Sequence, residues 1–293
     1  MATPASPLIS VASLAAAPGR YRIVEAGMRK VGAGVDADAA REAFGQGHIP
    51  GSVFADLWRD FSATDSPWPY QRPGAPAFSR AARAIGVRRE ETLVIYDRGD
   101  GIWAARLWWL FRAYGHTQVR VLDGGLGAWL AAGLPLERGA VEPAPGDFVA
   151  SADGERAFVD RAQVLEVVDG RRRAQLLNVL RRPVFTGVEQ RYARPGHIPG
   201  SLHLAHGSLL QGATGLLLPA PALRERFALL DRQLPVITYC GSGITAAGTA
   251  LALLVAGRDD VAIYDGSLAE WSADPTLALV TSNDRAAPDS PMK

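Results

Sequence analysis

The sequence contains two copies of the same pattern, and this internal repeat limits the folds that the chain can adopt. The hexapeptide GHIPGS occurs at Gly47–Ser52 and again at Gly196–Ser201. Two further pairs of segments follow at a nearly constant offset, VIYD with ITYC and VLDGGLGAW with IYDGSLAEW. Self-similarity of this kind is typical of duplicated structural units. The sequence therefore predicts two tandem domains with the same fold.

The composition between the two copies indicates where one domain ends and the next begins. Residues 141–154 are rich in proline, glycine, alanine and acidic side chains, which is typical of a linker. We expect a first domain over residues 1–140, a linker over 141–154 and a second domain over 155–281. Residues 282–293 have the composition of a flexible tail.

Each half alternates short β-rich runs with helical stretches. In the second half, apolar residues recur on one face from Ile244 to Val255, and Gly257 follows as a helix stop. A strand is expected on either side of this helix, at Val236–Tyr239 and Val261–Tyr264. The first half repeats the order with Leu93–Tyr96, Trp103–Ala113 and Val119–Leu122. Strand, crossover helix and strand predict an α/β fold in which helices cover both faces of a parallel sheet.

Charge and cysteine content exclude several classes of protein. The 293 residues carry a formal charge of +1 without a basic block, so neither nucleic acid nor an anionic membrane is an expected partner. No apolar run approaches the ~20 residues that a membrane span needs. The chain has one cysteine, and no basic residue precedes the apolar stretch that begins at Leu8. We therefore expect no disulfide, no signal peptide and a cytoplasmic location. The oligomeric state is left open.

The single cysteine, Cys240, follows a predicted strand and precedes a Gly-Ser-Gly turn. Ligand sites of open α/β sheets lie at the carboxyl ends of their strands. The main-chain N–H groups that follow, with the positive end of the next helix, would favour a thiolate there. The candidate donors are the loop residues Gly241, Ser242, Gly243, Ile244 and Thr245, although Thr245 is as well suited to cap the helix. The alternative is that Cys240 is a small apolar residue of the core.

These motifs resemble the rhodanese superfamily of sulfurtransferases in its tandem-domain form. The resemblance rests on CGSGITA after an apolar strand, on GHIPGS before it and on YDGSLAEW after it. In the first half, FADLWRDFSATDSPWPYQRP and AARLWWLFRAYGHTQVRVLDGG are similar to the inactive amino-terminal domain of that family. The resemblance implies two rhodanese-like domains. Asp97 occupies the position of the cysteine in the first of them, and that domain is therefore expected to be inactive.

The resemblance also implies a reaction. Cys240 takes a sulfur atom from thiosulfate or 3-mercaptopyruvate, becomes a persulfide, and passes that sulfur to cyanide or a thiol. No cofactor and no metal site are expected; Asp97 and Asp100 are more typical of helix caps than of cation ligands. Two alternatives remain open. One is a non-catalytic binding module; the other is a cysteine phosphatase, which would need an arginine where Ala246 stands.

In mercaptopyruvate sulfurtransferases, a first-domain His and Asp are thought to form a proton relay with the serine of the active-site loop. By resemblance that relay would be Asp38, His48 and Ser242. His48 and His197 also occupy equivalent places in the two GHIPGS copies, so each is expected to fix a turn in its own domain. His203 and His206 lack a third metal ligand, and a surface position is expected for them.

The choice of donor is less clear from the motifs. The CGSG loop is of the mercaptopyruvate type, whereas enzymes acting on thiosulfate carry basic residues directly after the cysteine. However, Leu180, Val184 and Gln190 stand where the resemblance places the arginines that bind the substrate carboxylate, and Asn178 replaces an acid. Four neighbouring arginines are candidates to replace them, namely Arg181, Arg182, Arg191 and Arg194.

Overall fold

The structure is a computed structural model that describes residues 6–27, 38–151 and 157–281. The chain divides into two compact units. The first contains Met1–Arg156 together with Leu210–Leu217, and the second contains Ala157–Leu209 and Leu218–Lys293. Each is described separately below.

The first unit is built on a parallel five-stranded sheet. Its strands are β1 (Leu8–Ile9), β2 (Tyr21–Gly27), β3 (Ser52–Asp56), β4 (Thr92–Tyr96) and β5 (Val119–Leu122), in the order β1-β5-β4-β2-β3. The register aligns Leu93 of β4 with Val119 of β5 and with Arg22 of β2. The central strand, β4, is apolar and buried from Leu93 to Tyr96, as expected of a strand covered on both faces.

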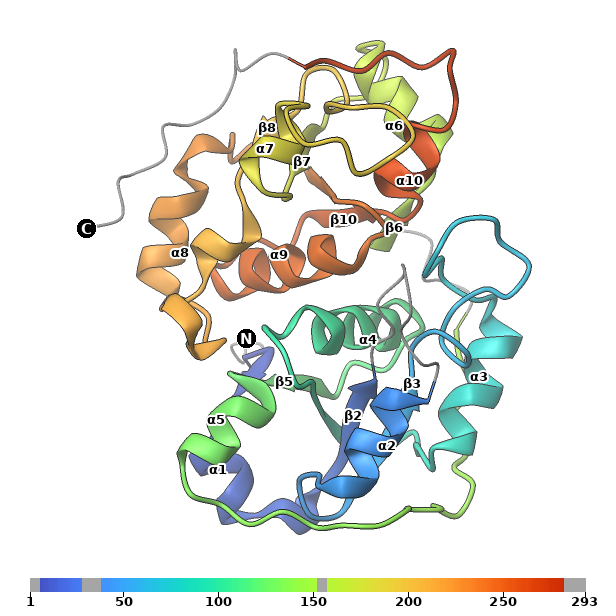
Figure 1. Cartoon of the computed structure of the whole chain (residues 1–293), viewed down its shortest axis with the longest axis vertical. Helices are drawn as coiled ribbons and strands as arrows, with labels where there is room; N and C mark the ends of the chain where they lie inside the picture. The colour runs from blue at the N-terminus through green and yellow to red at the C-terminus, as the bar shows by residue number, and fades with distance from the viewer. Residues whose placement is uncertain (1–5, 28–37, 152–156, 282–293) are drawn as a thin grey trace. The chain divides into compact units, whose positions relative to one another are not determined.

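Helices cover both faces of this sheet (Figure 1). They are α1 (Val11–Ala16), α2 (Ala39–Gln46), α3 (Ala75–Ala84), α4 (Ile102–Ala113) and α5 (Gly125–Ala131), with a 3-10 turn, η1, at Pro18–Arg20. One core cluster joins alternate residues of the strands, such as Val94 and Tyr96, to Leu14 of α1 and Trp129 of α5. The opposite face contacts α4, whose side chains are almost all buried.

The second unit repeats the same sheet. Its strands are β6 (Phe158–Val159), β7 (Gln175–Asn178), β8 (Leu202–His203), β9 (Val236–Tyr239) and β10 (Val261–Tyr264), all parallel, in the order β6-β10-β9-β7-β8. The α-helices are α6 (Arg161–Val168), α7 (Arg182–Phe185), α8 (Ala220–Arg226), α9 (Ile244–Val255) and α10 (Ser267–Trp271). The 3-10 turns are η3 (His206–Leu209) and η5 (Phe227–Leu229); η4 (Gly212–Thr214) belongs to the first unit.

The strand orders of the two sheets match one for one, which confirms the predicted duplication and the α/β fold. In both sheets the central strand, β4 or β9, lies between a strand that follows it in the chain, β5 or β10, and one that precedes it, β2 or β7. The order of the strands therefore reverses at this point. Ligands of open α/β sheets bind at this switch point, beyond the carboxyl ends of the strands. Asp97 follows β4 there, and Cys240 follows β9.

The predicted linker is not a free connection. Phe148 is 3% exposed, and its ring packs against Phe78, Phe111 and His116. The main chain before it is bonded to the first unit as well, since Gly146 N–H donates to the Arg83 carbonyl. Residues 141–151 are therefore part of the first unit, because an aromatic anchor outweighs the linker-like composition around it. The predicted tail, 282–293, lies outside the described residues.

Within the described ranges, every helix is too short or too polar to cross a bilayer.

Candidate active site

Cys240 lies between β9 and α9 and is 2% exposed. Its main chain is held on two sides: the N–H donates to Ser267 Oγ at 3.2 Å, and the carbonyl accepts from Leu268 N–H at 3.0 Å. Both partners belong to the start of α10. The thiol is thus placed at the carboxyl end of the central strand, as the sequence predicts.

The loop after Cys240 turns at Gly243, which has φ +77° and begins α9. The first main-chain bond of the helix runs from Ala247 N–H to the Gly243 carbonyl at 3.2 Å. In the described part of the chain, no acceptor is bonded to the N–H groups of Gly241 to Thr245. Several main-chain N–H groups of the loop are therefore available to bind an anion beside the thiol. The expectation that Thr245 caps the helix is wrong, because Gly243 holds the cap position without a side-chain bond.

The matching loop of the first unit already holds an anion. The Asp97 carboxylate is 1% exposed and accepts four main-chain N–H groups at 2.8–3.1 Å, those of Gly99, Gly101, Trp103 and Ala104. The pKa of Asp97 is raised, mainly by burial, and the N–H bonds from Ala104, Gly99 and Gly101 act in the opposite direction. Gly101 begins α4 with φ +84°, as Gly243 begins α9. This loop shape therefore surrounds a negative charge with main-chain donors, although the loop of the first unit is one residue longer.

The sequence reading missed Ser267. This buried residue adopts φ +50°, which is unfavourable for any side chain but glycine. Its Oγ accepts from Cys240 N–H and donates to the Tyr264 carbonyl at 2.8 Å. The equivalent residue of the first unit is Gly125, at φ +54°. The signal was present in the repeat, where DGG in the first copy becomes DGS in the second.

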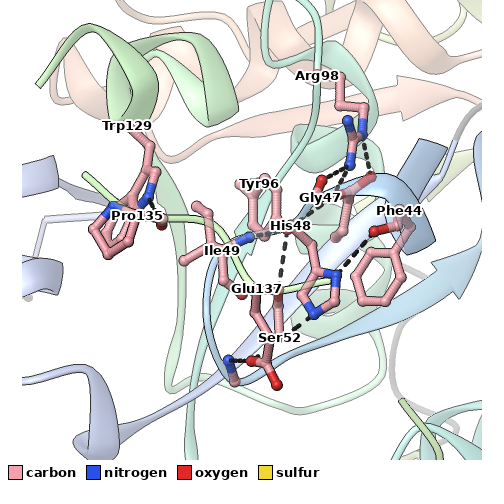
Figure 2. Close-up of polar contacts among 12 residues, drawn as sticks. Phe44, Gly47, His48, Ile49, Ser52, Tyr96, Arg98, Trp129, Pro135 and Glu137 are labelled. Atoms are coloured by element: carbon pink, nitrogen blue, oxygen red, sulfur yellow. Dashed lines mark hydrogen bonds and ion pairs between the residues drawn. The ribbon is translucent and has the colours of Figure 1, made fainter. Parts of the chain in front are cut away.

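Figure 2 shows His48 within its own unit. The ring is fully buried and stacks on Phe44, whose carbonyl lies 2.9 Å from Nδ1. Nε2 faces the Glu137 carboxylate at 3.9 Å, and the His48 main chain pairs with the same residue. His48 therefore fixes the turn after α2, as the repeat predicts. His197 does the same in the second unit, stacked on Phe185 and bridged to Val280.

The structure does not bring Asp38 to His48. Asp38 directly precedes α2 and His48 follows its carboxyl end, so about 12 Å of helix separates them. The Asp38 carboxylate instead pairs with Arg59 at 2.6 Å, which lowers the pKa of Asp38. The carboxylate that faces His48 is that of Glu137. The expected place of Asp38 in a relay is therefore corrected.

The four candidate arginines have different surroundings. Arg181 and Arg191 are exposed and share the Glu189 carboxylate at 2.7 and 3.1 Å. Arg182 is the first residue of α7 and is half-buried. Arg194 donates to the carbonyls of Trp271, Ser272, Asp274 and Leu277. Arg194 thus holds the segment after α10 with four of its five N–H donors, which argues against its expected role as a substrate contact.

The side chains at three of the positions where an acid or an arginine was expected are buried or packed against the core. Val184 is 3% exposed, and Leu180 packs against the core cluster of the second unit. Asn178 is fully buried, and its Oδ1 accepts from Leu180 N–H at 3.0 Å. The surface expectation for His203 and His206 is also wrong: both are buried, and they contact the Leu180 carbonyl and the Thr249 hydroxyl.

Comparisons with known proteins agree with this arrangement. The family model of the rhodanese-like domain matches residues 24–132 and 158–274. The 3-mercaptopyruvate sulfurtransferase of Homo sapiens is 38% identical over 239 residues, which cover 79% of each chain. The enzyme of that name from Escherichia coli strain K12 is 35% identical over 88% of this chain and 91% of its own. The crystal structure of SseA from Escherichia coli, described as a 3-mercaptopyruvate sulfotransferase, matches with a TM-score of 0.80 at 32% identity, covering 89% of this chain and 98% of its own.

The chain belongs to the rhodanese family and contains two rhodanese-like domains. Within that family it is a sulfurtransferase, as the sequence analysis predicted. The binding-module and phosphatase alternatives receive no support from these relatives.

Proposed function

We propose that this enzyme transfers sulfur from a small anionic donor through a persulfide on Cys240. The observation that carries the proposal is the loop after β9, where a buried thiol lies beside main-chain N–H groups without acceptors. A persulfide anion needs such donors and no general base. The Asp97 loop supports this, since the same loop shape accommodates a carboxylate with four N–H bonds.

The reaction has two steps. The Cys240 thiolate attacks the outer sulfur of the donor, a new S–S bond forms, and the bond within the donor breaks with its electron pair on the departing fragment. Cyanide or a thiolate then attacks the terminal sulfur, and Cys240 departs again as a thiolate. The N–H groups of the loop stabilise the negative charge throughout. Ser242 and Thr245, both half-buried, add hydroxyl groups to the proposed persulfide-binding loop.

We propose 3-mercaptopyruvate as the preferred donor. The relatives from Homo sapiens and Escherichia coli are named for it. Neither of the two residues directly after Cys240 is basic, so they offer no positive charge to the thiosulfate dianion. Arg181 and Arg191 are the proposed contacts for the donor carboxylate, because both are exposed and already share one carboxylate, that of Glu189. Arg182, next along the chain, is a further candidate.

Two other expectations remain part of the proposal. Asp38, whose carboxylate pairs with Arg59, is no longer proposed as a member of the relay; the roles of His48 and Ser242 stay a prediction from the resemblance. The single cysteine supports a cytoplasmic location, where thiols stay reduced.

Mass spectrometry after donor treatment tests the persulfide. We expect the protein to gain the mass of one sulfur atom at Cys240, and Cys240→Ser to gain none.

Steady-state assays should show faster turnover with 3-mercaptopyruvate than with thiosulfate, with cyanide as the acceptor in both. Inactivity on both donors would favour a binding module. In the same assays His48→Ala should slow turnover of 3-mercaptopyruvate and leave turnover of thiosulfate unchanged. Rates equal to those of the wild type on both donors would remove the predicted relay.

A further inference from the structure

The side chain of Tyr192 lies directly against the active-site loop. A β-carbon on Gly241 would come within 1.9 Å of the Tyr192 hydroxyl oxygen and 2.6 Å of its Cζ. No side chain other than hydrogen fits there, so Gly241 has to be glycine for the phenol to occupy this place. The Tyr192 ring packs against the core cluster of the second unit, which includes Tyr239 and Trp271. The position of the hydroxyl beside Cys240 is therefore set by packing.

The surroundings keep the phenol protonated. Burial raises the pKa of Tyr192, and the nearby negative charge of Cys240 raises it further. Arg191 acts in the opposite direction, while Glu189 adds to the increase. Tyr192 is thus a neutral hydrogen-bond donor at physiological pH, close enough to the thiol to respond to its charge.

The hydroxyl has no partner within the described residues. No hydrogen bond joins it to a side chain or to the main chain, although the Tyr192 carbonyl accepts from Gln190 at 3.2 Å. The hydroxyl is therefore available to donate a hydrogen bond. A sulfur on Cys240, the residue directly before Gly241, is the negatively charged acceptor that the proposed reaction creates.

We propose that Tyr192 is a further catalytic residue, whose hydroxyl donates a hydrogen bond to the outer sulfur during transfer and in the persulfide. This inference rests on the proposed persulfide at Cys240. When the thiolate attacks the donor, the new S–S bond leaves an anionic sulfur on Cys240, next in the chain to the Gly241 that the Tyr192 hydroxyl approaches. Tyr192 keeps its proton throughout, so the step needs no additional reactant. The hydroxyl adds a side-chain donor to the main-chain donors of the loop.

Tyr192→Phe tests the proposal because it removes only the hydroxyl and keeps the packed ring. Rapid mixing with saturating 3-mercaptopyruvate measures the rate of persulfide formation. In Tyr192→Phe this rate should fall about tenfold to a hundredfold, which corresponds to the loss of one hydrogen bond to a charged group. The donor concentration that half-saturates the reaction should change little, and so should the midpoint of urea unfolding. Tyr21→Phe is the matched control, since it removes a phenolic hydroxyl from a partly buried ring of the first unit.

Gly241→Ala provides a second test, because its methyl group would occupy the place of the hydroxyl. We expect this variant to form the persulfide more slowly than the wild type as well. Persulfide formation by Tyr192→Phe within twofold of the wild-type rate would overturn the role of Tyr192, whatever the result for Gly241→Ala, and so would an equal loss in Tyr21→Phe. If the wild-type protein itself never acquires sulfur, the proposed function fails and this role fails with it; a loaded wild type with an unaffected Tyr192→Phe overturns this role alone.

Discussion

Asp97 and Cys240 follow the central strands of their sheets in loops of similar shape. In the first loop a carboxylate accepts from the main-chain N–H groups, and in the second these groups have no acceptor in the described part of the chain. A second matched pair, Gly125 and Ser267, differs in the same way, because only the serine provides a hydroxyl for the main chain of the loop. Two side-chain differences, together with one residue of loop length, thus distinguish a loop whose donors bind a carboxylate from one whose donors have no acceptor among the described residues.

At this scale Ser267 gives a prediction about stability. Ser267→Ala removes two buried hydrogen bonds and should lower the free energy of unfolding by about 1–3 kcal/mol. Ser267→Gly removes the same bonds but relieves the positive φ, so it should be about 1 kcal/mol more stable than the alanine variant. Urea unfolding of both variants measures this. Equal stability of the two variants would show that the residue is not strained.

The elements of each unit pack as two helical layers on a parallel sheet, and one segment without regular structure joins the first of these packed layers. Residues 141–151 contain one aromatic side chain, that of Phe148, and it lies among Phe78, Phe111 and His116. The main chain on both sides is bonded to the unit, including Ser151 N–H to the Tyr114 carbonyl. One buried ring and a few main-chain bonds are sufficient to make this stretch part of the fold.

The corresponding prediction compares two neighbouring residues of this segment. Phe148→Ala should destabilise the first unit by about 3–5 kcal/mol, because it leaves a cavity among aromatic rings. Val149→Ala is the control: its side chain is 54% exposed, so its effect should stay within about 0.5 kcal/mol. Chemical denaturation followed by circular dichroism measures both. A neutral Phe148→Ala would mean that the segment is a free linker in solution.

At the scale of the whole molecule, each unit buries a histidine whose pKa is lowered, mainly by burial: His116 in the first and His197 in the second. The folded state therefore binds protons less readily than the unfolded chain, where the histidine pKa is about 6.5. It follows that these groups contribute stability above that pH and that the contribution is lost as the pH falls through their folded pKa values.

We therefore expect the free energy of unfolding to decrease between pH 7 and pH 5. His116→Phe should reduce that decrease, because phenylalanine keeps the stacking on Phe148 and cannot be protonated. Urea titrations at a series of pH values measure the difference between the variant and the wild type. An identical pH dependence in the two proteins would remove His116 as a cause.

The sequence by itself determined the duplication, the α/β class, the strands and helix around Cys240, and the place of Asp97. These follow from local patterns, such as the apolar run of Val236–Tyr239 and the 3.6-residue spacing in α9, which depend on neighbours along the chain. The comparison of the two copies also distinguished the Cys240 loop from the Asp97 loop, and the inactivity of the first domain stays a prediction.

Only the tertiary structure decided which distant residues meet. Tyr192 reaches Gly241 from 49 positions away in the numbering, Ser267 reaches Cys240 from α10, and Arg194 is taken by carbonyls after α10. It also placed Glu137, and not Asp38, opposite His48. Such contacts depend on the packing of whole elements around a sheet, and spacing along the chain carries little information about it because each loop can return in many directions.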